Sequence, residues 1–249
     1  NQTIGNLAFM GKMIFEKPLK KAQNPISIIP YLSTAKFEDF ENNTRNFNYS
    51  VGGDVKIPIG NALNLDLTLN PDFSQVEVDD QVVNLTRFAI SLPEKRQFFT
   101  QNDDLFKDFG ANNDVTPFFS RRIGIATDTA TGLALQNPIP YGLRLSGKVS
   151  QNTRVGLLNM QGASDASIQQ PGINYTVATI QQKVLTRSNL DFIFVNKQPF
   201  RLNLGDSSYK VASNQTAGLD FNLLSSDNKW SGNLFFHHSF DQVQVDKAH

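Results

Sequence analysis

Residues 47–57 read Phe-Asn-Tyr-Ser-Val-Gly-Gly-Asp-Val-Lys-Ile, and this stretch decides the fold. Its odd-numbered positions are apolar or glycine, and its even-numbered positions are polar or glycine. A period of two residues is typical of a β-strand, because successive side chains of a strand point to opposite faces of the sheet. The stretch therefore predicts a strand with one apolar and one polar face.

The same alternation recurs along the chain. After a turn-like Pro58-Ile59-Gly60-Asn61, residues 63–69 carry leucine at every odd position and polar residues between them, which predicts a hairpin. Further strands are predicted at residues 139–149, 173–177, 217–223 and 230–240, with a turn at 225–228, and less regular ones at 26–36, 154–161 and 190–197. Segments of about ten residues are the length that a tilted strand needs to cross an outer membrane.

Between residues 72 and 131 the alternation stops, and charges, paired phenylalanines and turn residues take its place. The only helical pattern lies at residues 94–109, and residues 79–92 fit either one strand or a helical turn. In a barrel, such a segment belongs inside the lumen. We therefore predict N-terminal barrel strands in residues 1–71, an inward-folded insertion or plug in 72–131, and further barrel strands in 132–249.

Composition excludes several classes of protein. The 23 basic and 23 acidic residues cancel, so the basic footprint of a nucleic-acid binder is missing. The chain has no cysteine, which excludes disulfides, thiolate zinc sites and a cysteine nucleophile. Its longest apolar runs, such as residues 192–195, are far shorter than the roughly 18 residues of a membrane-spanning helix. A membrane location would therefore require strands.

No arrangement of residues predicts catalysis, a metal site or a cofactor. His237 and His238 are neighbours on a strand, so they point to opposite faces and do not share a metal. The acid pairs at 79–80 and 103–104 are typical of solvated loops. The chain also shows no nucleophile elbow and no glycine-rich phosphate loop. We predict that the protein is not an enzyme.

The insertion carries the candidate functional residues. We predict that its charged groups form salt bridges that anchor it inside the lumen, with Arg121 and Arg122 folding back against acids of the insertion and with Lys56, Asp66, Arg144 and Lys148 as partners on the wall. The alternative is a solvated loop. The anchoring set is Glu94, Lys95, Arg96, Asp103, Asp104, Arg121 and Arg122, and the aromatic packing set is Phe98, Phe99, Phe106, Phe118 and Phe119.

A family resemblance rests on residues 67–77 and 83–88, on Pro93-Glu94-Lys95-Arg96 with Phe98-Phe99, and on Phe119-Ser120-Arg121-Arg122-Ile123-Gly124. These stretches resemble the uncharacterised domain that follows a family-9 carbohydrate-binding-like module in many bacterial surface proteins. The resemblance is specific over about residues 50–124 and looser beyond. It implies an outer-membrane β-barrel with the binding module on its N-terminal side, and it implies no catalytic residues.

The fold class expected is all-β: an antiparallel transmembrane β-barrel, of which this chain is an incomplete part, with a charged, aromatic-rich lumen insertion. The function expected is a structural, transport or surface-assembly role in the bacterial outer membrane. Expected partners are outer-membrane lipid, a glycan or other solute, and other outer-membrane subunits. One Trp and five Tyr against twenty Phe give little signal of an aromatic girdle. The alternatives are a soluble β-sandwich that binds glycans and a glycan-active hydrolase.

Overall fold

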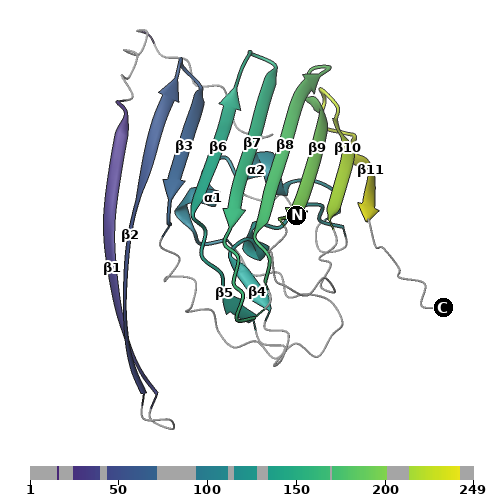
Figure 1. The fold of residues 1–249 in the computed structure, drawn as a ribbon. Helices are drawn as coiled ribbons and strands as arrows, with labels where there is room; N and C mark the ends of the chain where they lie inside the picture. Colours follow the sequence, from purple (N-terminus) through teal and green to yellow (C-terminus); the bar gives the residue numbers. More distant parts are fainter. Residues whose placement is uncertain are drawn as a thin grey trace, which may run out of the picture.

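The computed structural model describes residues 16, 25–39, 44–71, 94–111, 115–127, 134–168, 170–200 and 213–241. Nine strands of this part of the chain form one antiparallel sheet in the order β1-β2-β3-β6-β7-β8-β9-β10-β11 (Figure 1). Their bounds are β1 (Ser27–Asp39), β2 (Thr44–Ile59), β3 (Leu63–Leu69), β6 (Tyr141–Lys148), β7 (Thr153–Gly162), β8 (Ile173–Val184), β9 (Ser188–Pro199), β10 (Asn214–Leu224) and β11 (Ser231–Asp241).

The nine strands coincide with the nine segments in which the sequence alternates, so the all-β antiparallel prediction is confirmed. Several boundaries differ: Pro58 and Ile59 belong to β2, so that the turn occupies residues 60–62, β6 begins at Tyr141 and not at residue 139, and β8 continues from the predicted end at residue 177 to Val184. Gly60 adopts a positive φ of 65° in that turn, which glycine tolerates best. A separate two-stranded sheet pairs β4 (Ile125–Thr127) with β5 (Ala134–Gln136), inside and just beyond the predicted insertion.

The large sheet is open. Its edge strands are β1 and β11, and they do not pair with each other. Because nine strands alternate in direction, the two edges run the same way. Closure into a ring is not seen among the described strands, so the barrel stays a prediction.

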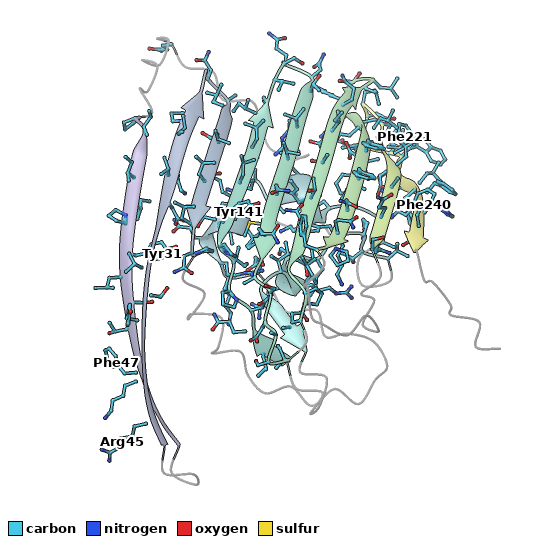
Figure 2. The ribbon with its side chains drawn as sticks, viewed as in Figure 1. Tyr31, Arg45, Phe47, Tyr141, Phe221 and Phe240 are labelled. Atoms are coloured by element: carbon cyan, nitrogen blue, oxygen red, sulfur yellow. The ribbon has the colours of Figure 1, made fainter. Side chains whose placement is uncertain are left out.

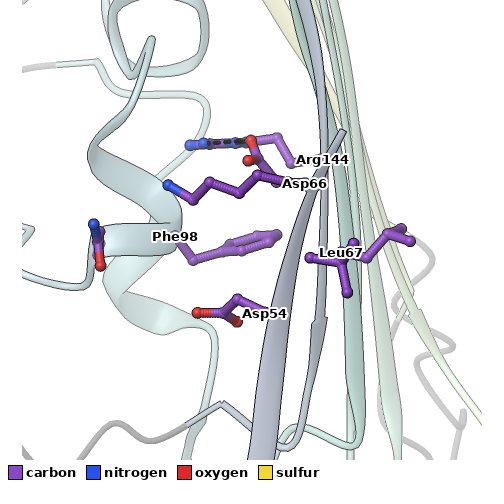
Figure 3. Close-up of a pocket in the computed structure, with 8 residues that line it drawn as sticks. Asp54, Asp66, Leu67, Phe98 and Arg144 are labelled. Atoms are coloured by element: carbon purple, nitrogen blue, oxygen red, sulfur yellow. Dashed lines mark hydrogen bonds and ion pairs between the residues drawn. The ribbon is translucent and has the colours of Figure 1, made fainter. Parts of the chain in front are cut away.

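The two faces of the sheet differ in what lies against them. We call one the covered face, because residues within 94–111 and 115–123 contact it, and the other the uncovered face. Asp66 and Arg144 point toward the insertion, whereas Leu67 points the other way (Figure 3). Alternation on β3 follows the same division, since Asp66 is 2% exposed and Leu69 is 64% exposed. On β3 and β6 the polar side of the strand is therefore the covered one, whereas the covered face of β7 to β9 carries buried apolar residues such as Leu158, Val177 and Ile193.

The segment predicted as one helix at 94–109 is broken into two short helices, α1 (Gln97–Thr100) and α2 (Asp104–Lys107). The break falls at Asn102, whose φ of 50° is incompatible with a continuous α-helix. A 3-10 turn, η3 (Ser120–Arg122), follows before β4. Figure 1 shows α1 and α2 lying behind the central strands of the sheet.

The apolar core lies between the insertion and the covered face. From the insertion come buried Phe99, Leu105, Phe106, Phe109, Phe118 and Ile123, and from the sheet Leu158, Met160, Val177 and Ile193, together with Ile139, which precedes β6. Phe98 packs against this cluster from its edge. The insertion is thus held by apolar contact as well as by the polar contacts described below.

Gly156 of β7 makes room for this core. A Cβ placed on Gly156 would lie 2.8 Å from the Phe106 ring and 2.5 Å from Thr179 Oγ1. We predict that Gly156→Ala lowers the free energy of unfolding by about 1–3 kcal/mol, because one extra methyl overpacks a filled interior. The measurement is the thermal unfolding midpoint of the full chain.

Gly53→Ala on the uncovered face is the matched control, since a Cβ there would lie 3.5 Å from the nearest atom, an ordinary contact distance. Equal effects of the two substitutions would contradict the packing assigned to Phe106.

Candidate functional site

A buried ion pair on the covered face of the sheet, which we call the wall, forms the centre of the candidate site. Asp66 of β3 and Arg144 of β6 are partners in the strand register. Arg144 Nη2 lies 2.8 Å from Asp66 Oδ2, and the two side chains are 1% and 3% exposed. Arg144 also donates through Nη1 to the backbone oxygen of Gln101 at 2.7 Å. One guanidinium therefore joins two wall strands to the insertion.

The link between α1 and α2 makes two further contacts with the wall. Asn102 Nδ2 donates to Ser146 Oγ of β6 at 3.1 Å, and Lys56 Nζ of β2 donates to Gln101 Oε1 at 3.4 Å. The Arg144 guanidinium lies 5.2 Å from the centre of the Phe98 ring. The bend that interrupts the predicted helix is thus the part that docks on the wall.

A second ion pair anchors α2. Asp104 accepts two hydrogen bonds from Arg154 of β7, at 2.5 Å from Nη1 to Oδ2 and 3.1 Å from Nη2 to Oδ1. This forked geometry is the stronger form of an arginine–carboxylate contact. Arg154 Nη1 also donates to Gln181 of β8 at 2.9 Å. The pair is more open than the first, since the side chains of Arg154 and Asp104 are 25% and 42% exposed.

A third anchor lies near the β11 edge. Asp220 of β10 is fully buried and accepts a hydrogen bond from the backbone N–H of Gly110 at 2.7 Å. Its other oxygen lies 2.5 Å from His237 Nε2 of β11. The insertion is therefore attached to strands at both sides of the sheet's centre.

The insertion is also closed on itself by a clamp between its ends. Arg96 donates to both oxygens of Glu94, at 2.8 Å from Nε and 2.7 Å from Nη2, and its Nη1 donates to the backbone oxygen of Ile123 at 2.6 Å. Ser120 Oγ donates to Glu94 Oε2 at 2.6 Å. The guanidinium stacks 4.2 Å from the Phe99 ring centre. We call this set the Glu94–Arg96 clamp.

The electrostatics of the insertion follow from these contacts. Burial pushes the pKa of Glu94 up, but the hydrogen bonds and charge of Arg96 and the hydroxyl of Ser120 outweigh burial and hold the pKa below its ordinary value. Burial raises the pKa of Asp108 and lowers that of Arg121. The clamp is thus a pair in which both groups are charged at neutral pH.

The predicted anchoring residues lie in one insertion, but their partners differ from the predicted ones. Glu94 pairs with Arg96, Asp104 with Arg154, and Asp103 with Lys107 at 2.6 Å. Arg121 is 6% exposed, while Lys95 and Arg122 are exposed. Of the wall residues named from the sequence, Lys56, Asp66 and Arg144 contribute and Lys148 is exposed. Phe99, Phe106 and Phe118 are buried, and Phe98 and Phe119 are half-buried.

Sequence reasoning missed three wall residues: Arg154, Asp220 and His237 as an anchor. All three occupy alternate strand positions that point to the covered face, and this alternation could have been read from the sequence. The segments that they contact are far away in the chain, so the contacts themselves could not. Residues 79–92, with the acid pair Asp79-Asp80 and the predicted strand or turn, lie outside the described residues.

A small cavity lies between α1 and the wall, lined among others by Asp54, Lys56, Phe98 and Arg144 (Figure 3). It leaves about 10 Å³, which is room for a single water molecule. Buried oxygens of Asp54 and Asp66 have no protein partner there, and a water molecule would satisfy them. The cavity is too small for an organic substrate, and the described residues contain no group of three or more acids or histidines placed to hold a metal ion.

Substitution of Arg144 tests the contribution of the Asp66–Arg144 ion pair to stability. We predict that Arg144→Met lowers the free energy of unfolding by about 3–5 kcal/mol, because it leaves the Asp66 carboxylate buried and uncompensated. Arg154→Met is the matched control, and we expect about 1 kcal/mol or less from it, because that pair is partly open to solvent. Urea unfolding of the two variants measures the difference; equal losses would contradict the central role of Arg144.

The Glu94–Arg96 clamp predicts an acid-sensitive insertion. Because folding lowers the pKa of Glu94, the stabilisation it provides is present above the unfolded value of about 4.3 and is lost as the pH falls through the lower folded pKa. We expect protease protection of residues 94–123 to fall below about pH 4 in the wild type. Glu94→Gln removes this titration, so that variant should show lower protection at neutral pH and a weaker acid-dependent loss.

No helix in the described part of the chain is long and apolar enough to span a membrane. No curated protein and no solved structure matches the chain. One family model, described as a domain of unknown function (DUF5916), matches residues 25–245. This range includes all nine strands of the large sheet and the insertion with its anchors. Since the match covers most of the sequence, the chain belongs to this family of uncharacterised domains.

Proposed function

We propose that this chain forms part of the wall of a bacterial outer-membrane β-barrel, with a structural, transport or surface-assembly role and no catalysis of its own. The observation that supports this most is the inverted polarity of the sheet. Its covered face is rich in paired charges, whereas its uncovered face is apolar and exposed. A membrane barrel has this arrangement, with lipid outside and a polar lumen inside.

The uncovered apolar surface reaches from β1 to β11. It includes Ile28 on β1 and Phe236 on β11, which are 72% and 71% exposed. Figure 2 places Phe47 beside the β1–β2 hairpin and Phe240 beside β11, at opposite edges of the sheet. Other large apolar residues of this face include Leu32, Tyr49, Val51, Leu69, Leu157, Ile180, Phe192, Leu219 and Leu234, each at least 38% exposed. Soluble monomers rarely expose contiguous apolar patches beyond roughly 300–600 Å².

A soluble β-sandwich would place its second layer on the apolar face of the sheet. Here the layer formed by residues 94–111 and 115–123 packs on the face that carries the buried ion pair Asp66–Arg144, and no other described segment lies over the opposite face with its exposed apolar residues. This arrangement supports lipid in preference to a second sheet as the neighbour of the uncovered face.

The insertion supports a non-catalytic role. Its acids Glu94, Asp103 and Asp104 each hold a cation, so none is left as a free general base among these three. On this proposal the insertion is a plug fixed to the inner wall, and a solute would pass only if the plug moved. The proposed partners are outer-membrane lipid, a glycan or other solute, and other outer-membrane subunits. An association with a carbohydrate-binding-like module is part of the same proposal.

A charge on the uncovered face tests the proposal. Phe192→Arg places a cation in the middle of the apolar face of β9, and an arginine at the midplane of a barrel destabilises it by about 2–4 kcal/mol. We predict that this variant accumulates less in the membrane fraction, and that the wild type floats with lipid vesicles and needs detergent for extraction. Leu185→Arg in the β8–β9 turn is the control, because Leu185 is already 77% exposed outside the strands.

In a soluble protein both substitutions would be nearly neutral, since both side chains are exposed. A wild-type protein that stays monomeric without detergent, with Phe192→Arg behaving like Leu185→Arg, would overturn the proposal.

A further inference from the structure

Residues that are paired across neighbouring strands form a row that runs across the sheet. The uncovered face changes from apolar to polar within a single such row. The row begins with Val55, Leu67 and Leu143 on β2, β3 and β6. It continues with Asn159, Thr176, Asn196 and Gln215 on β7 to β10. A boundary between two environments therefore does not follow the register rows.

The polar half of that row is organised by hydrogen bonds along the sheet surface. Asn159 Nδ2 donates to Thr176 Oγ1 at 2.8 Å and to Asn174 Oδ1 at 2.9 Å. Asn174 Nδ2 donates to Gln161 Oε1 at 3.2 Å. Neutral amides in this position can bond to one another and to water, so they suit the rim of an apolar surface better than its middle.

The apolar run extends farther along β2 than along β10. On β10 the last apolar residue before the amide Gln215 is Ala217, whose register row includes Ile57 of β2. On β2, by contrast, Val51 is 64% exposed and Tyr49 is 76% exposed. Val51 lies six residues beyond Ile57, and Phe47, which is 67% exposed, lies ten residues beyond it, so the apolar surface reaches at least six residues farther along β2 than along β10.

Charges begin only beyond this limit. Among strand residues whose side chains the structure describes, the charged ones on the uncovered face are Lys36 and Arg45, both farther along the β1–β2 hairpin than Tyr49. His238 of β11 is the one histidine on this face, in the row of Ala217, and it packs edge-on against Phe240 at 4.4 Å. On β1 and β2, the end of the apolar surface therefore separates a part of the uncovered face without charges from a part that carries Lys36 and Arg45.

A shift of this kind corresponds to strands that are tilted relative to the boundary, as the strands of membrane barrels are. The shift falls between β7 and β2, because Asn159, Thr176, Asn196 and Gln215 of β7 to β10 lie in one row. The opposite rim slopes the same way, because β10 continues five residues beyond Leu219, which shares the row of Ile59 where β2 ends.

We infer that the boundary between acyl chains and water follows the amide row of Asn159, Thr176, Asn196 and Gln215 from β7 to β10, and then descends across the rows through Tyr141 on β6 to Tyr49 on β2. This inference rests on the proposed function and adds the position of the sheet in a lipid bilayer. Tyrosines at Tyr49 and Tyr141 are placed where barrels carry interfacial aromatic residues. Residues of β7 to β10 beyond the amide row then lie in the headgroup region or in water.

Two positions separate a diagonal boundary from one that follows the register. Gln198 of β9 shares the row of Gly53, and Val51 lies two residues farther from the β2–β3 turn than Gly53. A boundary along the rows would make Gln198 at least as deep in the bilayer as Val51. The diagonal boundary places Val51 in acyl chains and Gln198 outside them.

The experiment uses single-cysteine variants of the full chain, which has no cysteine of its own, labelled with an environment-sensitive fluorophore in phospholipid vesicles. We expect Val51→Cys and Phe192→Cys to show blue-shifted emission that is quenched by lipid-borne quenchers. We expect Gln198→Cys to show red-shifted emission that is quenched by aqueous iodide. Ser239→Cys, on the covered face of β11, is the matched control and should respond to iodide alone.

The outcomes separate the inference from the proposed function. If Phe192→Cys is lipid-exposed but Gln198→Cys is equally so, or Val51→Cys is aqueous, the diagonal boundary is wrong and the membrane location stands. If Phe192→Cys, Val51→Cys and Gln198→Cys are all quenched by iodide alone, the proposed function itself is wrong.

Discussion

The Arg144 side chain holds together three parts of this structure that are separate in the sequence. It pairs with Asp66 on the neighbouring strand, donates to the insertion at Gln101 and lies near the ring of Phe98. A charge with an exposure of 1% requires such partners, because a buried and unpaired ion is strongly unfavourable. The polar wall therefore depends on the insertion for its cover and the insertion on the wall for its position.

The arrangement reverses the usual organisation of a globular domain. In a soluble sheet protein the second layer covers the apolar face, whereas here it covers the face that carries Asp66, Arg144 and Asp220. In the middle of the sheet the same face is apolar, and Phe99 and Phe106 of the insertion form a core there with Leu158, Val177 and Ile193. Gly156 allows the closest approach of this core to the sheet.

The family match and the geometry contribute different kinds of information. The match assigns the chain to a family of uncharacterised domains without naming an activity. The geometry shows Glu94 and Asp104 of the insertion held in ion pairs, a cavity the size of one water and an uncovered face with exposed apolar residues.

The sequence alone determined the strands, because alternation with a period of two depends only on neighbouring residues. It also located the charged insertion and the aromatic residues that pack in it. Only the tertiary structure decided which cation each acid meets and which face is covered. Asp104 and Arg154 are 50 residues apart, and Gly110 and Asp220 are 110 apart, so no local pattern contains their pairing. Nearby Arg121 and Arg122 looked like suitable partners in sequence, but strand register and the bend at Asn102 bring other groups to the acids.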